Sequence, residues 1–233
     1  MVLEVYLDPC TINSRKALAG LDLVGAEYKY NFINYFEGGQ KDPEFVKNIN
    51  PFATVPAAVD GDLHITESNA ILQYAADLTN SKAYPKDLKE RANVNRWLLW
   101  ETSSWFPSCY IYLIQNIVQP LLGNKPDQAT IDGEADNFNK LAGILDTQLG
   151  KTKYIASNEI TIADIAVAAP MHLWEASKLP LDNYPNLKRW IQSIEKEPSW
   201  QKTQGAVEKA LLPNKQVREA NAAESEFPAN NTL

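Results

Sequence analysis

Apolar and polar residues follow two different patterns along this chain, and the change falls near residue 80. Before it, short runs with strand-like apolar patterning alternate with stretches in which apolar residues recur at helical spacing. The runs are a strand at Val2–Leu7, a helix at Arg15–Val24, a strand at Tyr28–Ile33, a short helix at Pro43–Ile49, strands at Val55–Val59 and Leu63–Ile65, and a helix that ends near Thr79. The order β-α-β-α-β-β-α predicts an α/β unit of the thioredoxin type.

The predicted hairpin and the helix start behind it hold the most informative functional signal. Asp60-Gly61 joins two apolar runs, which strongly indicates a hairpin, and the segment 66–69 is rich in residues that begin helices. The N-terminus of a helix offers backbone N–H groups to a carboxylate, and a nearby Glu can pair with an ammonium group. Glu67 and Ser68 therefore indicate a site for the two charges of an α-amino acid end group.

After residue 88 the pattern predicts helices alone. The expected helices are Lys89–Leu122, Ile131–Leu149, one through Ile165–Leu173, and Asn186–Glu195. Pro107 is expected to break or kink the first of these, because proline lacks the backbone N–H that a helix interior needs. Thr161 to Asp164 form a capping box, with Asp in place of the usual Glu, and its expected role is structural.

These elements predict an α+β fold in two domains. A thioredoxin-like α/β domain is expected at residues 1–79, a linker at 80–87, and an all-helical domain at 88–206. Residues 207–233 are expected to be a mobile tail, because after Pro213 its one aromatic anchor is Phe227.

Composition narrows the classes of function. The chain has 233 residues, 45% of them hydrophobic, and a net charge of −7, which argues against nucleic acid or an anionic membrane as the main partner. No apolar run approaches the length of a membrane span, and the first residues lack the pattern of a signal peptide.

The cysteines and histidines indicate neither a disulfide framework nor a metal centre. Cys10 and Cys109 are the only cysteines, so a reducing compartment is the natural interpretation and a cytoplasmic protein is expected. His64 and His172 are far apart in sequence and belong to no Cys/His cluster, so no metal site is expected.

The motif spacing resembles the glutathione-binding core of cytosolic glutathione transferases. Val55-Pro56 is followed about ten residues later by Glu67-Ser68, and the resemblance covers roughly residues 1–205. It implies a thioredoxin-like domain followed by an all-helical one, a homodimer, and glutathione as co-substrate. It further implies a cis Pro56, a backbone pairing of Val55 with the cysteinyl part of glutathione, and a γ-glutamyl group held by Glu67 and Ser68.

Glutathione becomes a strong nucleophile when its thiol loses a proton, and the groups that stabilise the thiolate are expected in the first strand-to-helix turn. A thiol of pKa about 8.5 is only a few per cent thiolate at pH 7. A charge-assisted hydrogen bond to sulfur contributes about 1.5–3 kcal/mol, which corresponds to a pKa lower by about one to two units. The turn begins at Cys10 and enters the helix near Arg15.

Three interpretations of that turn compete. The segment from Val5 resembles the theta class, in which a catalytic Ser stands where this chain has Thr11; the run 84–88 is theta-like as well. Thr11 with Asn13 and Lys16 is similar to the nu class, which handles disulfides with two bound glutathiones. Cys10 stands where the omega class has a catalytic Cys that forms mixed disulfides, although the Pro that follows it there is absent. Ser14 is a further candidate, and its other interpretation is a helix-capping hydroxyl.

The remaining glutathione contacts carry over from the family one by one. Gln40 and Lys41 stand where the theta class has a His and a Lys facing the glycine carboxylate, and Lys41 is preferred because it brings charge. Thr54 replaces a frequent Lys before the Val-Pro pair, so one cation is missing.

Aromatic residues of the first long helix are candidates for the electrophile site, namely Trp105, Phe106, Tyr110 and Tyr112. At near-helical spacing they can equally belong to the core. Glu101 could reach across a dimer to the γ-glutamyl amine, and Cys109 is expected to be a packed thiol.

The leading functional hypothesis is a glutathione transferase that conjugates glutathione thiolate to small apolar electrophiles, with Thr11 stabilising the sulfur. A second is a glutathione-dependent disulfide or dehydroascorbate reductase that uses Cys10, or Thr11 with Asn13. A third is a non-catalytic binding protein, since the same fold resembles domains of translation elongation factor 1-gamma and of a fungal nitrogen regulator.

Overall fold

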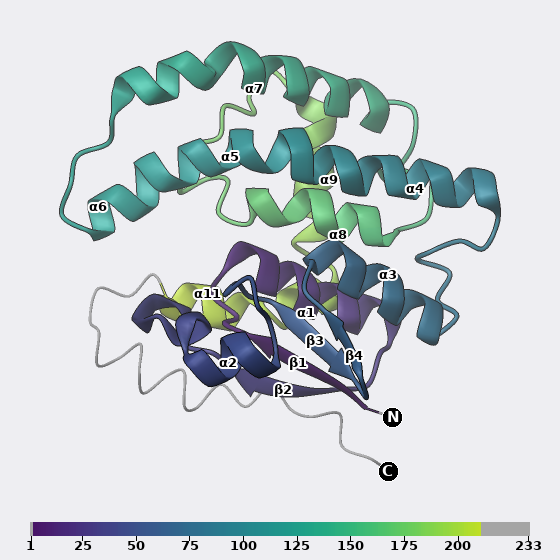
Figure 1. Cartoon of the computed structure of the whole chain (residues 1–233). Coiled ribbons are helices and arrows are strands. Elements are labelled where there is room, and N and C mark those ends of the chain that lie inside the picture. The colour runs from purple at the N-terminus through teal and green to yellow at the C-terminus, as the bar shows by residue number, and fades with distance from the viewer. Residues whose placement is uncertain (1, 211–233) are drawn as a thin grey trace. The chain divides into compact units, whose positions relative to one another are not determined.

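The computed structural model describes residues 2–210, which form two compact units (Figure 1). Residues 2–84 and 198–210 make the first unit, and residues 85–197 make the second. The first is a four-stranded sheet with helices, and the second is helical. The α/β-then-helical fold expected from the sequence is confirmed. The predicted domain limits 1–79, 80–87 and 88–206 remain a prediction.

The sheet of the first unit has β1 (Leu3–Leu7) in its interior, in the order β2-β1-β3-β4. β2 (Tyr28–Phe32) runs parallel to β1, whereas β3 (Ala57–Asp60) runs antiparallel to it and continues through a hairpin into β4 (Leu63–Ile65). Leu7 lies opposite Phe32, and Tyr6 lies opposite Ala57. The carboxyl ends of β1 and β2 and the amino end of β3 therefore share one edge of the sheet, which we call the site edge.

Helices cover both faces of this sheet. α1 (Ile12–Val24) and α3 (Ser68–Leu78) pack against each other, so closely that a Cβ on Gly20 would lie 1.9 Å from a methyl of Leu72. On the opposite face, Phe45 of α2 (Pro43–Asn48) lies edge-on to Tyr6 with ring centroids 6.3 Å apart. Since side chains alternate along a strand, β1 presents different residues to the two helical layers.

The chain returns to the first unit after residue 197, through α10 (Pro198–Gln201) and α11 (Gln204–Ala210). Arg15 of α1 has no exposed surface, and its guanidinium lies 4.2 Å from the ring centre of Trp200. Its Nε donates to Thr203 Oγ1 at 2.8 Å and its Nη2 to Gln204 Oε1 at 2.6 Å. Of the tail expected at 207–233, the first four residues belong to α11, and 211–233 lie outside the described residues.

The second unit opens with one continuous helical stretch made of five segments. They are α4 (Leu88–Trp100), the π-helical η3 (Glu101–Trp105), α5 (Phe106–Leu113), the π-helical η4 (Ile114–Val118) and α6 (Gln119–Leu121). Figure 1 shows this stretch running alongside α7 (Gln128–Leu149). No helix among the residues that the structure describes is long and apolar enough to span a membrane.

Pro107 does not break this stretch, contrary to one of the two outcomes expected from the sequence. The wider π turn that ends at Trp105 precedes it, with the Phe106 N–H bonded to the Glu101 carbonyl five residues back. The second π turn precedes Pro120 in the same way, with the Gln119 N–H bonded to Ile114. A proline cannot donate to the carbonyl four residues earlier and clashes with it, and a widened turn accommodates it.

The core of the second unit is organised around the buried carboxylate of Asp164 in α8 (Ile162–Ala168). It accepts the N–H of Thr161 at 2.9 Å, the N–H of Ile155 at 2.9 Å and the indole N–H of Trp190 in α9 (Pro185–Ile194) at 3.0 Å. The capping box expected from the sequence is present. Burial raises the pKa of Asp164, and its hydrogen bonds oppose that shift.

We expect Asp164→Ala to lower the free energy of unfolding by about 3 kcal/mol or more, because it leaves several buried donors without an acceptor. Asp182→Ala is the matched control, since that carboxylate is exposed and pairs with Lys188 at 3.2 Å on the surface; its expected effect is below about 1 kcal/mol. Urea denaturation of both variants checks this. Equal losses in the two variants would contradict the assignment.

Candidate functional site

The turn between β1 and α1 is held by Asp8, whose carboxylate is almost completely buried. One carboxylate oxygen accepts the N–H of Cys10 at 3.0 Å, and the other accepts the N–H of Tyr35 at 3.1 Å. Its main-chain carbonyl accepts the N–H of Thr11 at 3.0 Å. Burial raises the pKa of Asp8, and the two backbone donors act in the opposite direction. Asp8 thus ties the turn to the loop that follows β2.

Two hydroxyls of this turn lie side by side. Thr11 Oγ1 donates to Ser14 Oγ at 2.7 Å and lies 3.1 Å from the carbonyl oxygen of Asp8. Thr11 is partly exposed, whereas Ser14 has no exposed surface. Of these two hydroxyls, only that of Thr11 can reach a bound molecule.

The two thiols differ in accessibility. Cys10 is partly exposed, and its Sγ donates to the main-chain oxygen of Ala206 in α11 at 3.2 Å. Cys109 is completely buried, as expected for a packed thiol, and burial next to the acidic Glu101 and Glu134 raises its pKa well above the usual value. A thiol with a raised pKa is a poor nucleophile near neutral pH, so Cys10 is the reactive candidate.

The start of α3 meets the start of α1 at the site edge. Ser68, the first residue of α3, is buried, and its hydroxyl lies 3.4 Å from Asn13 Oδ1. Glu67 is exposed and makes no side-chain cap, which argues against a purely capping role. Its carboxylate is available to a ligand, next to the N–H groups that begin α3.

The loop before β3 is fixed by Asn50, which has no exposed surface. Its amide nitrogen donates to the Thr54 carbonyl at 2.8 Å and to Thr54 Oγ1 at 3.0 Å, while its oxygen accepts the N–H of Phe52 at 2.9 Å. The peptide bond between Val55 and Pro56 is cis, as the family resemblance implied. The main chain of Val55 is thereby presented at the site edge.

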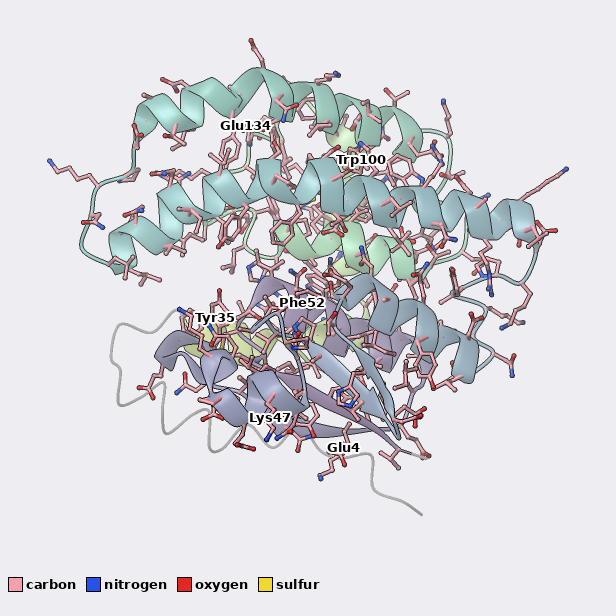
Figure 2. The ribbon with its side chains drawn as sticks, viewed as in Figure 1. Glu4, Tyr35, Lys47, Phe52, Trp100 and Glu134 are labelled. Atoms are coloured by element: carbon pink, nitrogen blue, oxygen red, sulfur yellow. The ribbon has the colours of Figure 1, made fainter. Side chains whose placement is uncertain are left out.

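The loop after β2 contains two short 3-10 turns, η1 (Tyr35–Glu37) and η2 (Gly39–Lys41). Gln40 is 6% exposed, and within the described part of the chain its Oε1 has no hydrogen-bond partner. Lys41 is exposed. Figure 2 labels Tyr35 on this loop and Phe52 on the loop before β3; both rings are exposed.

Four segments distant in sequence therefore converge on the site edge: the turn at 8–14 and the loops at 33–41, 50–56 and 66–68. Together they offer a hydroxyl, a carboxylate, an ammonium group, an amide and helix N-termini. A ligand that suits this set is peptide-like and carries both charges. No group of metal-ligating side chains is found among residues 2–210.

Two polar residues that shape this edge, Asp8 and Asn50, were not singled out from the sequence. Asp8 directly follows a predicted strand and Asn50 precedes Pro51, so both looked like ordinary turn residues. Asp8 is held by a residue 27 positions later in the chain, and the burial of Asn50 depends on how its own loop folds. The local sequence pattern predicts neither of these contacts.

The aromatic candidates of the second unit divide into core and surface. Trp105 is completely buried, stacks on Phe138 at 5.2 Å and donates its indole N–H to the Val167 carbonyl. Tyr112 is also buried and contacts the same Phe138 ring. For these two, the structure favours the core interpretation that the sequence left open. Tyr110 is 41% exposed.

Glu101, considered for a contact across a dimer, is completely buried. Its carboxylate accepts the hydroxyl of Thr102 at 3.3 Å. A side chain without exposed surface does not present itself to a second molecule in this conformation.

Family models match both parts of the chain. The model described as "Glutathione S-transferase, N-terminal domain" matches residues 1–77, and the model described as "Glutathione S-transferase, C-terminal domain" matches residues 110–198.

Curated relatives align over nearly their whole length. A probable glutathione S-transferase GSTF2 from Oryza sativa subsp. japonica is 31% identical over 204 residues, which is 86% of this chain and 94% of the relative. Glutathione S-transferase 1 from Zea mays is 31% identical over 203 residues, with the same two shares.

Solved structures agree with this likeness. Glutathione transferase F7 from Populus trichocarpa has a TM-score of 0.80 at 28% identity, covering 88% of this chain and 99% of that one. Glutathione S-transferase I from maize, in complex with an atrazine glutathione conjugate, has a TM-score of 0.79 at 29% identity over 89% and 99% of the two chains. A theta-class enzyme from Xanthomonas axonopodis pv. citri has a TM-score of 0.77 at 25% identity over 87% and 96%.

The membership in the glutathione transferase family expected from the sequence is confirmed, but the similarity is not specific to the theta class. The relatives include plant enzymes of the F type, the phi class, and a theta-class structure is similar as well. The short theta-like runs, such as 84–88, are too few to separate these classes.

We expect Asp8→Asn to release at least one of the two backbone amides that Asp8 holds, because an Asn side chain has a single acceptor oxygen. Hydrogen exchange of the Cys10 or Tyr35 amide should accelerate by about tenfold, the loss of a hydrogen bond to a charged group. Asp62→Asn, in the exposed hairpin turn, is the control. Unchanged protection of both amides would contradict this role.

The raised pKa of Asp8 adds a pH dependence to the same comparison. The folded protein binds a proton at a pH where the unfolded chain has already lost it, so stability falls as pH rises through the raised pKa. The wild type should therefore gain stability over Asp8→Asn when the pH is lowered from a value above the raised pKa of Asp8 to a value near the ordinary pKa of an aspartate. Urea titrations at the two pH values check the sign, and a change in the opposite direction would exclude it.

Proposed function

This chain belongs to the cytosolic glutathione S-transferase family, and we propose that it conjugates glutathione to small apolar electrophiles through a thiolate stabilised by Thr11. The observation that carries the proposal is the partly exposed Thr11 hydroxyl at the site edge, surrounded by the groups that the three parts of glutathione require. Reactions of this kind serve detoxification.

Each part of glutathione has a proposed partner. The γ-glutamyl ammonium pairs with Glu67, and its carboxylate receives the Ser68 hydroxyl and the N–H groups that begin α3. The cysteinyl main chain pairs with Val55 next to the cis Pro56. The glycine carboxylate faces the exposed ammonium group of Lys41 and the amide NH2 of Gln40, which can donate to it, with Thr54 close to it on the neighbouring loop.

The proposed reaction begins with transfer of the thiol proton to solvent water. The Thr11 hydroxyl donates a hydrogen bond to the sulfur, which favours the thiolate by about 1.5–3 kcal/mol and lowers the pKa of the bound thiol by about one to two units. The thiolate then attacks the electrophilic carbon. A carbon–sulfur bond forms, and the leaving group departs with the bonding electron pair.

For the electrophile we propose a class of molecule and one aromatic contact. The maize relative bound to an atrazine glutathione conjugate supports conjugation as the reaction class. Tyr110, which is 41% exposed, is the leading aromatic candidate, and its ring stacks on that of the partly exposed Phe106 with centroids 5.4 Å apart; Trp105 and Tyr112 are buried. From its membership in the family, we also propose that the protein forms a homodimer and that it is located in the cytoplasm.

The test replaces the Thr11 hydroxyl. Thr11→Val should lower kcat with a chloronitrobenzene by about 10- to 100-fold near neutral pH, because the thiol pKa returns toward its unperturbed value. Thr11→Ser, the matched control, keeps the donor and should retain most of the rate. Glutathione KM should change little in either variant. An unchanged kcat in Thr11→Val, with glutathione still bound, would exclude the role of Thr11.

A second candidate function, reduction of disulfides or dehydroascorbate, is favoured by the partly exposed Cys10 in the same turn. In this mechanism the Cys10 thiolate attacks one sulfur of the disulfide and forms a mixed disulfide with it, while the other sulfur leaves as a thiolate. A glutathione thiolate then attacks the substrate sulfur of the mixed disulfide, which frees Cys10 as a thiolate and releases the product as a disulfide with glutathione. The version without Cys10 uses Thr11 and Asn13 to hold the sulfur of a bound glutathione.

Cys10→Ser separates these functions. Conjugation is measured with a chloronitrobenzene, and we expect the variant to keep this rate because hydroxyl activation does not use Cys10. Disulfide reduction is measured with hydroxyethyl disulfide, by NADPH oxidation coupled through glutathione reductase. Loss of disulfide reduction in Cys10→Ser would instead assign thiol transfer to Cys10. The non-catalytic alternative requires that the protein fail to bind glutathione at millimolar concentration.

A further inference from the structure

We propose that Ser14 is a positioning residue that aims the Thr11 hydroxyl at the glutathione sulfur by donating a hydrogen bond to Thr11 once glutathione is bound. This inference rests on the proposed function of Thr11 and concerns how that hydroxyl is oriented. It gives Ser14 a role different from both a capping hydroxyl and a direct partner of sulfur.

Burial excludes direct contact between Ser14 and a ligand. Ser14 has no exposed surface, and its Oγ lies 2.7 Å from Thr11 Oγ1. Among the described residues, the Ser14 hydroxyl accepts this bond and donates none. A buried hydroxyl carries one proton that needs an acceptor, and the oxygen of Thr11 is the one within reach.

Without a ligand, the single hydroxyl proton of Thr11 has two acceptors within reach. They are Ser14 Oγ at 2.7 Å and the Asp8 carbonyl oxygen at 3.1 Å. When the Thr11 proton turns to the glutathione sulfur, it leaves both. The Asp8 carbonyl keeps the Thr11 backbone N–H at 3.0 Å, whereas Ser14 Oγ loses its donor.

Rotation of the Ser14 hydroxyl restores a complete set of hydrogen bonds. The distance of 2.7 Å serves a bond in either direction, so Ser14 can donate to Thr11 Oγ1 while Thr11 donates to sulfur. Hydrogen bonds in such a chain polarise one another, which makes Thr11 a stronger donor to a thiolate. The proton positions change by rotation alone, and no covalent bond is made or broken.

The experiment measures the pKa of the bound thiol in Ser14→Ala. Thiolate absorbance of the enzyme–glutathione complex and the pH profile of kcat should both show a pKa raised by about half to one unit. Below that pKa, kcat should fall about 3- to 10-fold, and above it the variant and wild-type rates should converge. Glutathione KM should change less than about twofold.

Two further variants make the test specific. Ser199→Ala removes a buried hydroxyl of the same unit for which residues 2–210 offer no hydrogen-bond partner, and it should leave the thiol pKa unchanged. Ser14→Cys fills the same buried space with a weaker donor and should give an intermediate pKa; it also serves as the test if Ser14→Ala does not fold.

Double substitution decides whether Ser14 acts through Thr11. In a Thr11→Val background, Ser14→Ala should have no further effect on the pKa or on kcat. An unchanged thiol pKa in Ser14→Ala, or an equal shift in both backgrounds, overturns the inference while the role of Thr11 stands. If Thr11→Val itself leaves the rate unchanged, the proposed function of Thr11 fails and the inference fails with it.

Discussion

The position of β1 in the interior of the sheet is the constraint on which the rest of the site depends. One parallel and one antiparallel neighbour bring the carboxyl ends of β1 and β2 to the same edge as the amino end of β3. Because side chains alternate along a strand, a slip of β3 by one residue would turn its buried face outward. The apolar packing of β1 and β3 therefore also fixes the placement of the Thr11 turn relative to the cis Pro56.

Buried polar groups at this edge hold the loops of the site in place. The carboxylate of Asp8 joins two loops, and the amide of Asn50 shapes a third. Buried polar groups stabilise a fold only when their hydrogen bonds are satisfied, so each also restricts its loop to one conformation. In the second unit the buried carboxylate of Asp164 does the same for helices that carry no proposed ligand contact.

Local signals in the sequence predicted much of this molecule. The hairpin at Asp60-Gly61, the capping box at Thr161 and the cis Pro56 implied by the family motif are present in the structure. Two features could not be predicted because they depend on contacts distant in sequence: the burial of Asp8 and the return of residues 198–210 to the first unit. A third, the π turn before Pro107, is a local widening of the helix that the apolar pattern does not indicate. The roles of individual glutathione-binding residues remain predictions, because hydroxyl and amide groups suit several classes of the family.

The return of the chain to the first unit has a consequence for biosynthesis. Arg15 is buried against Trp200 and bonded to Thr203, a residue 188 positions later in the chain. During translation the N-terminal sheet therefore emerges with this cation uncovered, and the helical unit is synthesised before its cover arrives. The N-terminal segment that the family model delimits, residues 1–77, therefore lacks the groups that cover Arg15, which the chain supplies at residues 200–204.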